Sequence, residues 1–276
     1  WSQDLYVGSG AAITTLPGSV LFVGSNTSID ALASLTTTSD ATASGSFIVS
    51  GTTTGNITYK RYIEDINWHL VSAPVTSQSI PSFVGVAGNA VAISTTTGSS
   101  AVSYYKNTNT AGNRWTYHNA APDSEKENQE TLTNFIAGQG YSMKKTAIGD
   151  YTFTGAMANA DVSVTIPTIT TAGTHLWSAI GNPFPSFLAV NTAADAANLL
   201  IDNLAALDGS FAFLYVWNGT SYDAIGHGAA LQLAPGQAFL VRAKTDGQTF
   251  IFKKTLQKHN SGLATFYRPS TATPTI

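Results

Sequence analysis

Two stretches of this sequence resemble each other and decide how the rest is interpreted. "LAPGQAFLVRAK" at 233–244 has the same Gly-Gln step as "IAGQGYSMKKTA" at 136–147, and Gly236 follows Gly138 by 98 residues. In both, Gly and Gln precede a short apolar run, which predicts a turn that leads into a β-strand. The likeness raises the hypothesis that part of the chain is duplicated.

Other landmarks recur in the same order around this motif. Upstream, "HLVSA" at 69–73 returns as "HLWSA" at 175–179, an offset of 106 residues. Between these landmarks and the Gly-Gln motif lie two aromatic hairpins, "VSYYKNTNTAGNRWTYHN" at 102–119 and "AFLYVWNGTSYDAI" at 212–225. We therefore expect two related all-β units of roughly 100 residues, a size typical of β-sandwich domains. The same match makes His69 and His175 equivalent, which favours a structural role for both.

The domain boundaries follow from where these patterns begin and end. Residues 1–62 carry short apolar runs separated by Gly, Ser and Asn, which predicts either coils of a β-solenoid or a plain meander. The first β-sandwich-like unit is expected at 63–168 and the second at 169–276. A short helical insertion is predicted near 191–208, where Ala and Leu recur at helical spacing and Asn191 or Thr192 is placed to cap the start.

Composition excludes several classes of function. The chain of 276 residues has a formal net charge of −3 and a pI near 5.9, whereas a nucleic-acid-binding surface needs clustered Lys and Arg. No apolar run approaches the roughly 20 residues that a membrane-spanning helix needs. The absence of cysteine excludes disulfides, thiolate metal sites and a cysteine nucleophile.

Catalytic and metal-binding signatures are not found in the sequence. No His-Glu-x-x-His motif or EF-hand loop is present. The acidic residues Asp123, Glu125 and Glu127 are interpreted as a solvated loop, with a weak Ca²⁺ site as the alternative. Arg114, Tyr117 and His118 offer groups that a polysaccharide lyase uses, but alternation along a strand places Tyr117 on the opposite face from the other two. We therefore expect no enzyme activity and no cofactor.

Aromatic residues on the two hairpins are the remaining candidates for a binding site. Trp115 and Tyr117 lie on the first hairpin, and Trp217 and Tyr222 lie on the second. Aromatic faces stack on sugar rings because the faces are apolar and polarised. The alternative is that these four side chains fill a core or a seam between the two units.

Four segments resemble a known group of proteins. "NWHLVSAPV", "HLWSAIGNPFPS", "LYVWNGTSYDA" and "LAPGQAFLVRAK" follow an N-terminal "LYVGSGAAITTLPGSVLFVGSN". Together they look like the β-rich passenger region of surface proteins that Bacteroidetes export through the type IX secretion system. The resemblance implies an extracellular or outer-membrane surface location after removal of a signal peptide. It also implies a C-terminal sorting domain, which this chain does not contain.

The two ends of the chain leave alternatives open. The start "WSQD" looks like a mature terminus produced by signal-peptide removal, but an artificial boundary would look the same. Likewise, the end at "STATPTI" fits either removal of a sorting domain or a chain that was cut there.

Three functional hypotheses follow, in decreasing order of support. The first is a surface structural or adhesive module that associates with itself or with another surface protein, because low charge leaves its edge strands little protection. The second is a carbohydrate-binding module of a secreted polysaccharide-degrading system. The third is a polysaccharide lyase or glycoside hydrolase.

Overall fold

The computed structural model describes residues 3–167, 175–226 and 228–260. The described chain is all-β, as predicted, with two α-helices of six and five residues. Within these residues, no helix is long and apolar enough to cross a membrane.

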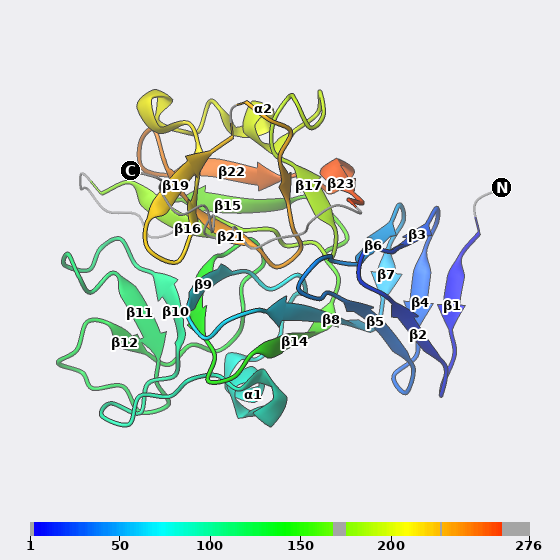
Figure 1. Ribbon diagram of the computed structural model, residues 1–276, viewed down its shortest axis with the longest axis horizontal. Helices are drawn as coiled ribbons and strands as arrows, with labels where there is room; N and C mark the ends of the chain where they lie inside the picture. Colours follow the sequence, from blue (N-terminus) through cyan, green and yellow to red (C-terminus); the bar gives the residue numbers. More distant parts are fainter. Residues whose placement is uncertain (1–2, 168–174, 227, 261–276) are drawn as a thin grey trace, which may run out of the picture.

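The N-terminal strands form a solenoid (Figure 1). They stack in three parallel sets, β1-β4-β7, β2-β5-β8 and β3-β6. Their bounds are β1 Leu5–Val7, β2 Ala12–Thr15, β3 Val20–Val23, β4 Thr27–Ile29, β5 Ser34–Thr38, β6 Ser46–Val49, β7 Thr53–Thr54 and β8 Asn56–Ile63. A meander would pair consecutive strands antiparallel, so the parallel stacking excludes that alternative. Val7, Leu35 and Phe47 face the interior, where all three are buried.

Strand β8 joins the solenoid to the first unit. It pairs in parallel with β5 on one side and antiparallel with β14, Gly149–Ala156, on the other. One hydrophobic core accordingly runs through both parts, because Phe47 of the solenoid and Phe153 of the first unit belong to the same buried cluster. The expected boundary at residue 62 therefore falls at the end of a strand that both parts share.

The first unit contains a five-stranded sheet in the order β12-β11-β10-β13-β9. Its remaining elements are β9 Trp68–Val71, α1 Ile80–Gly85, the 3-10 turn η1 Ala87–Asn89, β10 Val102–Tyr105, β11 Trp115–His118, β12 Gln129–Glu130 and β13 Tyr141–Lys144.

The second unit contains a four-stranded sheet in the order β16-β21-β18-β19. Its elements are β15 Val162–Ile166, β16 Trp177–Gly181, β17 Phe187–Ala189, α2 Leu199–Asn203, η2 Gly209–Phe211, β18 Leu214–Trp217, β19 Tyr222–Ile225, β20 Gln232–Leu233, β21 Ala238–Arg242, β22 Gln248–Phe252, η3 Lys254–Leu256 and β23 Gln257–Lys258. Strand β15 pairs with β22, so this unit's sheets begin before the expected boundary at 169.

Four strands of each unit follow the same order in their sheets. The corresponding strands, in chain order, are β9 and β16, β10 and β18, β11 and β19, and β13 and β21. Within each unit, every pair of adjacent strands in this set is antiparallel. The antiparallel pairing of β8 with β14 has its counterpart in the pairing of β15 with β22. In Figure 1 the second unit lies over the first, and the solenoid lies beside them.

The strand register corrects the alignment expected from the sequence. Trp68 pairs with Lys144, and Trp177 pairs with Arg242. Arg242 follows Lys144 by 98 residues, which is the offset of the Gly-Gln motif. The two tryptophans are therefore equivalent, at an offset of 109 residues rather than 106. The counterpart of His69 is Ser178, and His175 precedes β16. The two histidines are not equivalent, so the argument from their equivalence was wrong.

The helix in the second unit is shorter than predicted. Asn198 caps it by accepting a hydrogen bond from the amide of Ile201. Upstream, the side chains of Asn191 and Asp195 accept from the amides of Ala194 and Ala197. Such local bonds compete with helix formation, which explains why the alanine-rich stretch forms turns instead.

Candidate functional site

One candidate site is a groove on the outer face of the first unit's sheet. It has a volume of about 510 Å³, within the usual range for small-ligand sites. We call it the Trp68 groove. It is lined by Trp68, Ala92, Ile93, Ser94, Thr97, Ser99, Ser100, Ala101, Tyr117, Lys126, Asn128, Gln129 and Lys144.

Strand pairing brings the two aromatic residues of the groove together. Tyr117 on β11 pairs with Ser103 on β10. Ser103 pairs in turn with Ser142 on β13, and Ser142 pairs with Leu70 on β9. Trp68 lies on the same face as Leu70 because side chains alternate along a strand. The Trp68 and Tyr117 rings meet edge to face, with 5.9 Å between their centroids. Small residues between them leave both rings partly exposed.

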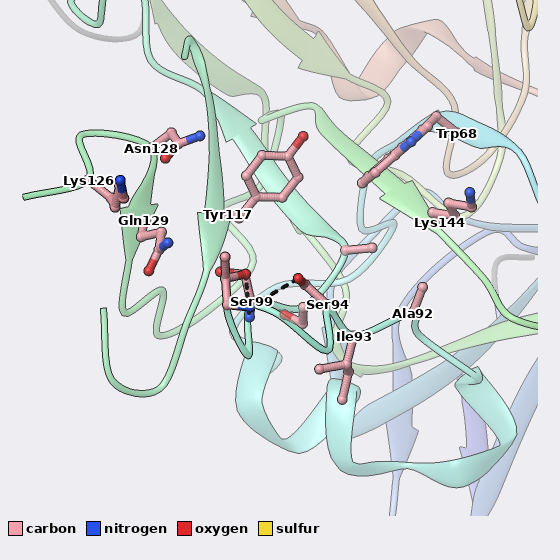
Figure 2. A pocket seen from close by; sticks show the side chains of 13 residues that line it. Trp68, Ala92, Ile93, Ser94, Ser99, Tyr117, Lys126, Asn128, Gln129 and Lys144 are labelled. Atoms are coloured by element: carbon pink, nitrogen blue, oxygen red, sulfur yellow. Dashed lines mark hydrogen bonds between the residues drawn. The ribbon is translucent and has the colours of Figure 1, made fainter. Parts of the chain in front are cut away.

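A polar loop forms one side of the groove. Lys126 and Asn128 come from the loop that precedes β12, and Gln129 is the first residue of β12. The loop is anchored because the Tyr117 amide donates to the Asn128 carbonyl at 2.9 Å, and Asn119 Nδ2 donates to Gln129 Oε1 at 3.0 Å. In Figure 2 Tyr117 is seen between these loop residues and the pair Trp68 and Lys144.

The acidic residues of this loop do not form a metal site. Glu127 accepts hydrogen bonds from Thr110 and Asn113, which lower the pKa of its carboxyl. Asp123 accepts from the amide of Glu125 at 3.0 Å, as in a turn. Across the described residues, no group of three or more His, Asp or Glu side chains is placed to hold a metal ion.

The lyase-like constellation is divided between the two faces of β11. Tyr117 faces the groove, and burial raises the pKa of its hydroxyl. His118 is buried on the opposite face, where its Nδ1 accepts from the Leu132 amide at 3.1 Å. Burial lowers the pKa of this imidazole. The expected separation of Tyr117 from His118 is confirmed, and the site offers no assembled acid and base pair.

The other three predicted aromatic residues lie at the junction of the two units. Trp115 packs edge to face on Tyr105, with 5.2 Å between the ring centroids, and Trp217 packs on Tyr222, with 5.0 Å between the ring centroids. Tyr222 lines a second cavity of about 350 Å³ together with Tyr105, His175, Trp177, Tyr215 and Leu240. Burial, followed by the neighbouring Tyr105, raises the pKa of Tyr222 to about 12. The four predicted residues therefore do not form one platform.

The junction cavity differs in character from the Trp68 groove. Its lining is mainly aromatic, and its one imidazole is engaged, because His175 Nε2 lies 2.6 Å from Tyr105 Oη. Burial lowers the pKa of His175, and the charges of Arg114 and Arg242 act in the same direction. The contacts tie the first hairpin to the start of β16, which agrees with the predicted alternative of a seam between units.

A family comparison covers most of the chain. Residues 1–227 match the family described as a domain of unknown function, DUF8693. The chain belongs to this family. No curated protein and no solved structure matches it. The matched range of DUF8693 contains the whole Trp68 groove, but it ends after β19, although β21 and β22 complete the sheets of the second unit.

In this DUF8693 chain, the counterpart of the groove in the second unit contains more aromatic side chains, and Trp177 and Tyr215 line the junction cavity there. Trp177 is the equivalent of Trp68. Its ring centroid lies 4.8 Å from that of Tyr215 and 5.8 Å from that of Phe211. By register Tyr215 replaces Ser103 of the first unit. Arg242 lies over Phe211 at 4.6 Å and pairs with Asp208. A small residue at the Ser103 position is therefore particular to the first unit.

Sequence reasoning found Tyr117 but missed its partners. Trp68 lies in the quoted segment "NWHLVSAPV". It pairs with Lys144, which is 76 residues away, so no local sequence pattern indicates this pairing. Lys126 lies among the acidic residues that the sequence predicts to form a solvated loop, and Asn128 and Gln129 follow it closely. Alternation along β9 places Trp68 on the face of Tyr117 only once the strand order of the sheet is known.

Proposed function

We propose that the chain is an adhesive module that binds carbohydrate in the Trp68 groove. The observation that carries the proposal is the open pair of Trp68 and Tyr117 rings beside polar Asn128 and Gln129 side chains. Aromatic faces accept the apolar faces of sugar rings, and amide groups both donate to and accept from hydroxyls. The groove supplies both requirements on one surface.

The same groove gives no support to the hydrolase alternative. Glycoside hydrolysis uses two carboxyl groups across the scissile bond, and the described residues that line the groove include no Asp, Glu or His. Binding without cleavage is therefore the activity that we propose for this site. The proposed location is the cell surface, which the resemblance to exported passenger regions supports.

Native affinity electrophoresis through gels containing a panel of polysaccharides tests the proposal. We expect at least one polymer to retard the protein without being cleared from the gel. Trp68→Ala should abolish the retardation, whereas Trp217→Ala at the junction of the units should not. Melting temperatures of both variants serve as the folding control. Clearing of the polymer would instead make the protein an enzyme, and migration unaffected by every glycan would contradict the proposal.

Self-association is a second candidate function, supported by the first coil of the solenoid. Among the described strands, β1, β2 and β3 are end strands of their sheets. The outer face of this coil exposes Tyr6, Leu16, Val20 and Phe22. Unpaired strand edges beside apolar side chains favour strand addition by a second copy.

Light scattering over a range of protein concentrations tests self-association. We expect the average mass to rise with concentration, and Phe22→Lys to prevent the rise. The matched control is Lys244→Gln, which changes a charge on an exposed residue of the second unit. A constant monomer mass at high concentration would rule this candidate out.

A further inference from the structure

We infer that the ligand of the Trp68 groove is an acidic polysaccharide, whose carboxylate or sulfate groups are bound by Lys126 and Lys144. The inference rests on the proposed function, because it names the class of glycan that the groove selects. It comes from the charges that line the groove, whereas the proposed function comes from its aromatic rings.

Both lysines are placed by the fold beside the aromatic pair. Lys144 pairs with Trp68 in the sheet, so its side chain emerges on the face that carries the Trp68 ring. Lys126 comes from the loop on the other side of Tyr117, as Figure 2 shows. A sugar ring stacked at the centre of the groove would therefore have a cation on each side.

The lining of the groove is positively charged in a protein of net negative charge. Its described residues include these two lysines and no carboxylate, although the whole chain has a formal net charge of −3. Within the described part of the chain, neither Nζ takes part in an ion pair. Cations that lack an internal partner remain available to an anionic ligand.

Nearby carboxylates make their hydrogen bonds and ion pairs with residues outside the groove lining. Glu130 binds Lys106 and Tyr104, and Asp65 binds His69. Glu127 is held by Thr110 and Asn113. Glu125 and Glu127 are the sequence neighbours of Lys126, and their charges make the field at Lys126 less positive than the field at Lys144. We therefore expect Lys144 to contribute more to binding than Lys126.

Matched polymers that differ only in charge test the inference. The probes are dextran against dextran sulfate, and methyl-esterified pectin against de-esterified pectin, each with the intact chain in affinity electrophoresis. We expect the protein to bind only the charged member of at least one pair. Which pair responds distinguishes sulfate from carboxylate. Binding should weaken between 0.05 and 0.5 M NaCl, as added salt shortens the Debye length from roughly 14 to 4 Å.

Charge-neutralising variants connect the selectivity to the groove. Lys144→Gln should weaken binding by about fivefold, the upper range for a solvent-accessible ion pair. Lys126→Gln should weaken binding less, and the double variant should lose the salt dependence. Lys244→Gln is the matched control, because Lys244 is exposed in the second unit, and it should bind as the unaltered chain does.

The outcomes separate this inference from the proposed function. Equal binding of neutral and charged polymers that is lost in Trp68→Ala would leave the groove a glycan site and overturn the inference. Binding of charged polymers that survives the double lysine substitution would also overturn it. Loss of charged-polymer binding in the lysine variants but not in Trp68→Ala would contradict the aromatic site instead. No retardation by any polymer would overturn both.

Discussion

The backbone amide of Ser72 donates a hydrogen bond to the carbonyl of Gly236 at 3.0 Å, and this contact joins the two units. Its counterpart runs in the opposite direction, from the amide of Gly181 to the carbonyl of Gly138 at 2.9 Å. By register Ser72 corresponds to Gly181, and Gly138 corresponds to Gly236. Each Gly-Gln turn therefore docks on the edge strand of the other unit, so that the repeated motif forms a reciprocal interface.

Gly181 is predicted to be essential to this interface. A Cβ atom there would lie 2.6 Å from Ser72 Cβ and 2.8 Å from Ala238 Cβ, and such overpacking costs about 1–3 kcal/mol. Gly181→Ala should therefore lower the free energy of unfolding by roughly that amount in chemical denaturation. Gly85→Ala is the control, because no atom lies within 4 Å of the added Cβ. Equal stability of the two variants would contradict this account of the interface.

Much of the fold could be predicted because its signals are local. Short apolar runs separated by Gly, Ser and Asn predicted either a solenoid or a meander, and the repeated Gly-Gln motif raised the hypothesis of two related units. The register was missed because the letters shared by "HLVSA" and "HLWSA" favour an offset of 106, whereas Trp68 and Trp177 face equivalent partners at 109. A shift of an odd number of residues also reverses which face a side chain occupies.

The candidate site could be predicted only in part, because its residues converge through tertiary pairing. Tyr117 belongs to an aromatic hairpin that is visible in the sequence, but Trp68 reaches it across β13 and β10. Tyr215 occupies the position in the second unit that the smaller Ser103 occupies in the first. Such a difference between a large and a small residue becomes meaningful only once the register is known.

Lys145 is predicted to give the protein a stability that rises with pH above about 8. Its ammonium is buried, donates to the carbonyls of Asn89 and Asp150, and lies 4.4 Å from the centre of the Tyr151 ring. Burial lowers its pKa to about 8 from the ordinary 10.5. Between these values the unfolded chain binds more protons than the folded chain, so stability increases as pH rises.

Comparison with Lys145→Met isolates this contribution. From pH 7 to 9.5 the free energy of unfolding of the unaltered chain should rise by about 2 kcal/mol relative to the variant. The variant itself should be less stable at pH 7, because two buried carbonyls lose their donor. Urea denaturation at several pH values measures both effects. Parallel pH profiles for the two proteins would show that Lys145 has an ordinary pKa.

Tyr59 is predicted to make the protein sensitive to strong alkali. It is fully buried, and burial raises the pKa of its hydroxyl to about 12 from 10. Above pH 10 the unfolded chain releases this proton and the folded chain retains it, so stability falls as pH rises. Tyr59→Phe should reduce the slope above pH 10, at a cost of about 1 kcal/mol for the lost bond to the Gly45 carbonyl.

Absorbance of ionised tyrosine, followed together with circular dichroism, measures this transition. Tyr62→Phe, on the same strand but only partly buried, is the control. The two substitutions should differ in their effect on the slope above pH 10. A slope unchanged by Tyr59→Phe would indicate that other groups determine the alkaline transition.

Tyr117 is predicted to act in the Trp68 groove through its ring and not through its hydroxyl. The ring lines the groove and packs on Trp68, with 5.9 Å between the two ring centroids. Tyr117→Phe keeps the stacking surface and should bind the retarding glycan within about twofold of the unaltered chain, whereas Tyr117→Ala should lose about tenfold in affinity. Affinity electrophoresis at several polymer concentrations gives both dissociation constants. Equal losses in Phe and Ala variants would assign the contact to the hydroxyl, and no loss in either would place the glycan outside the groove.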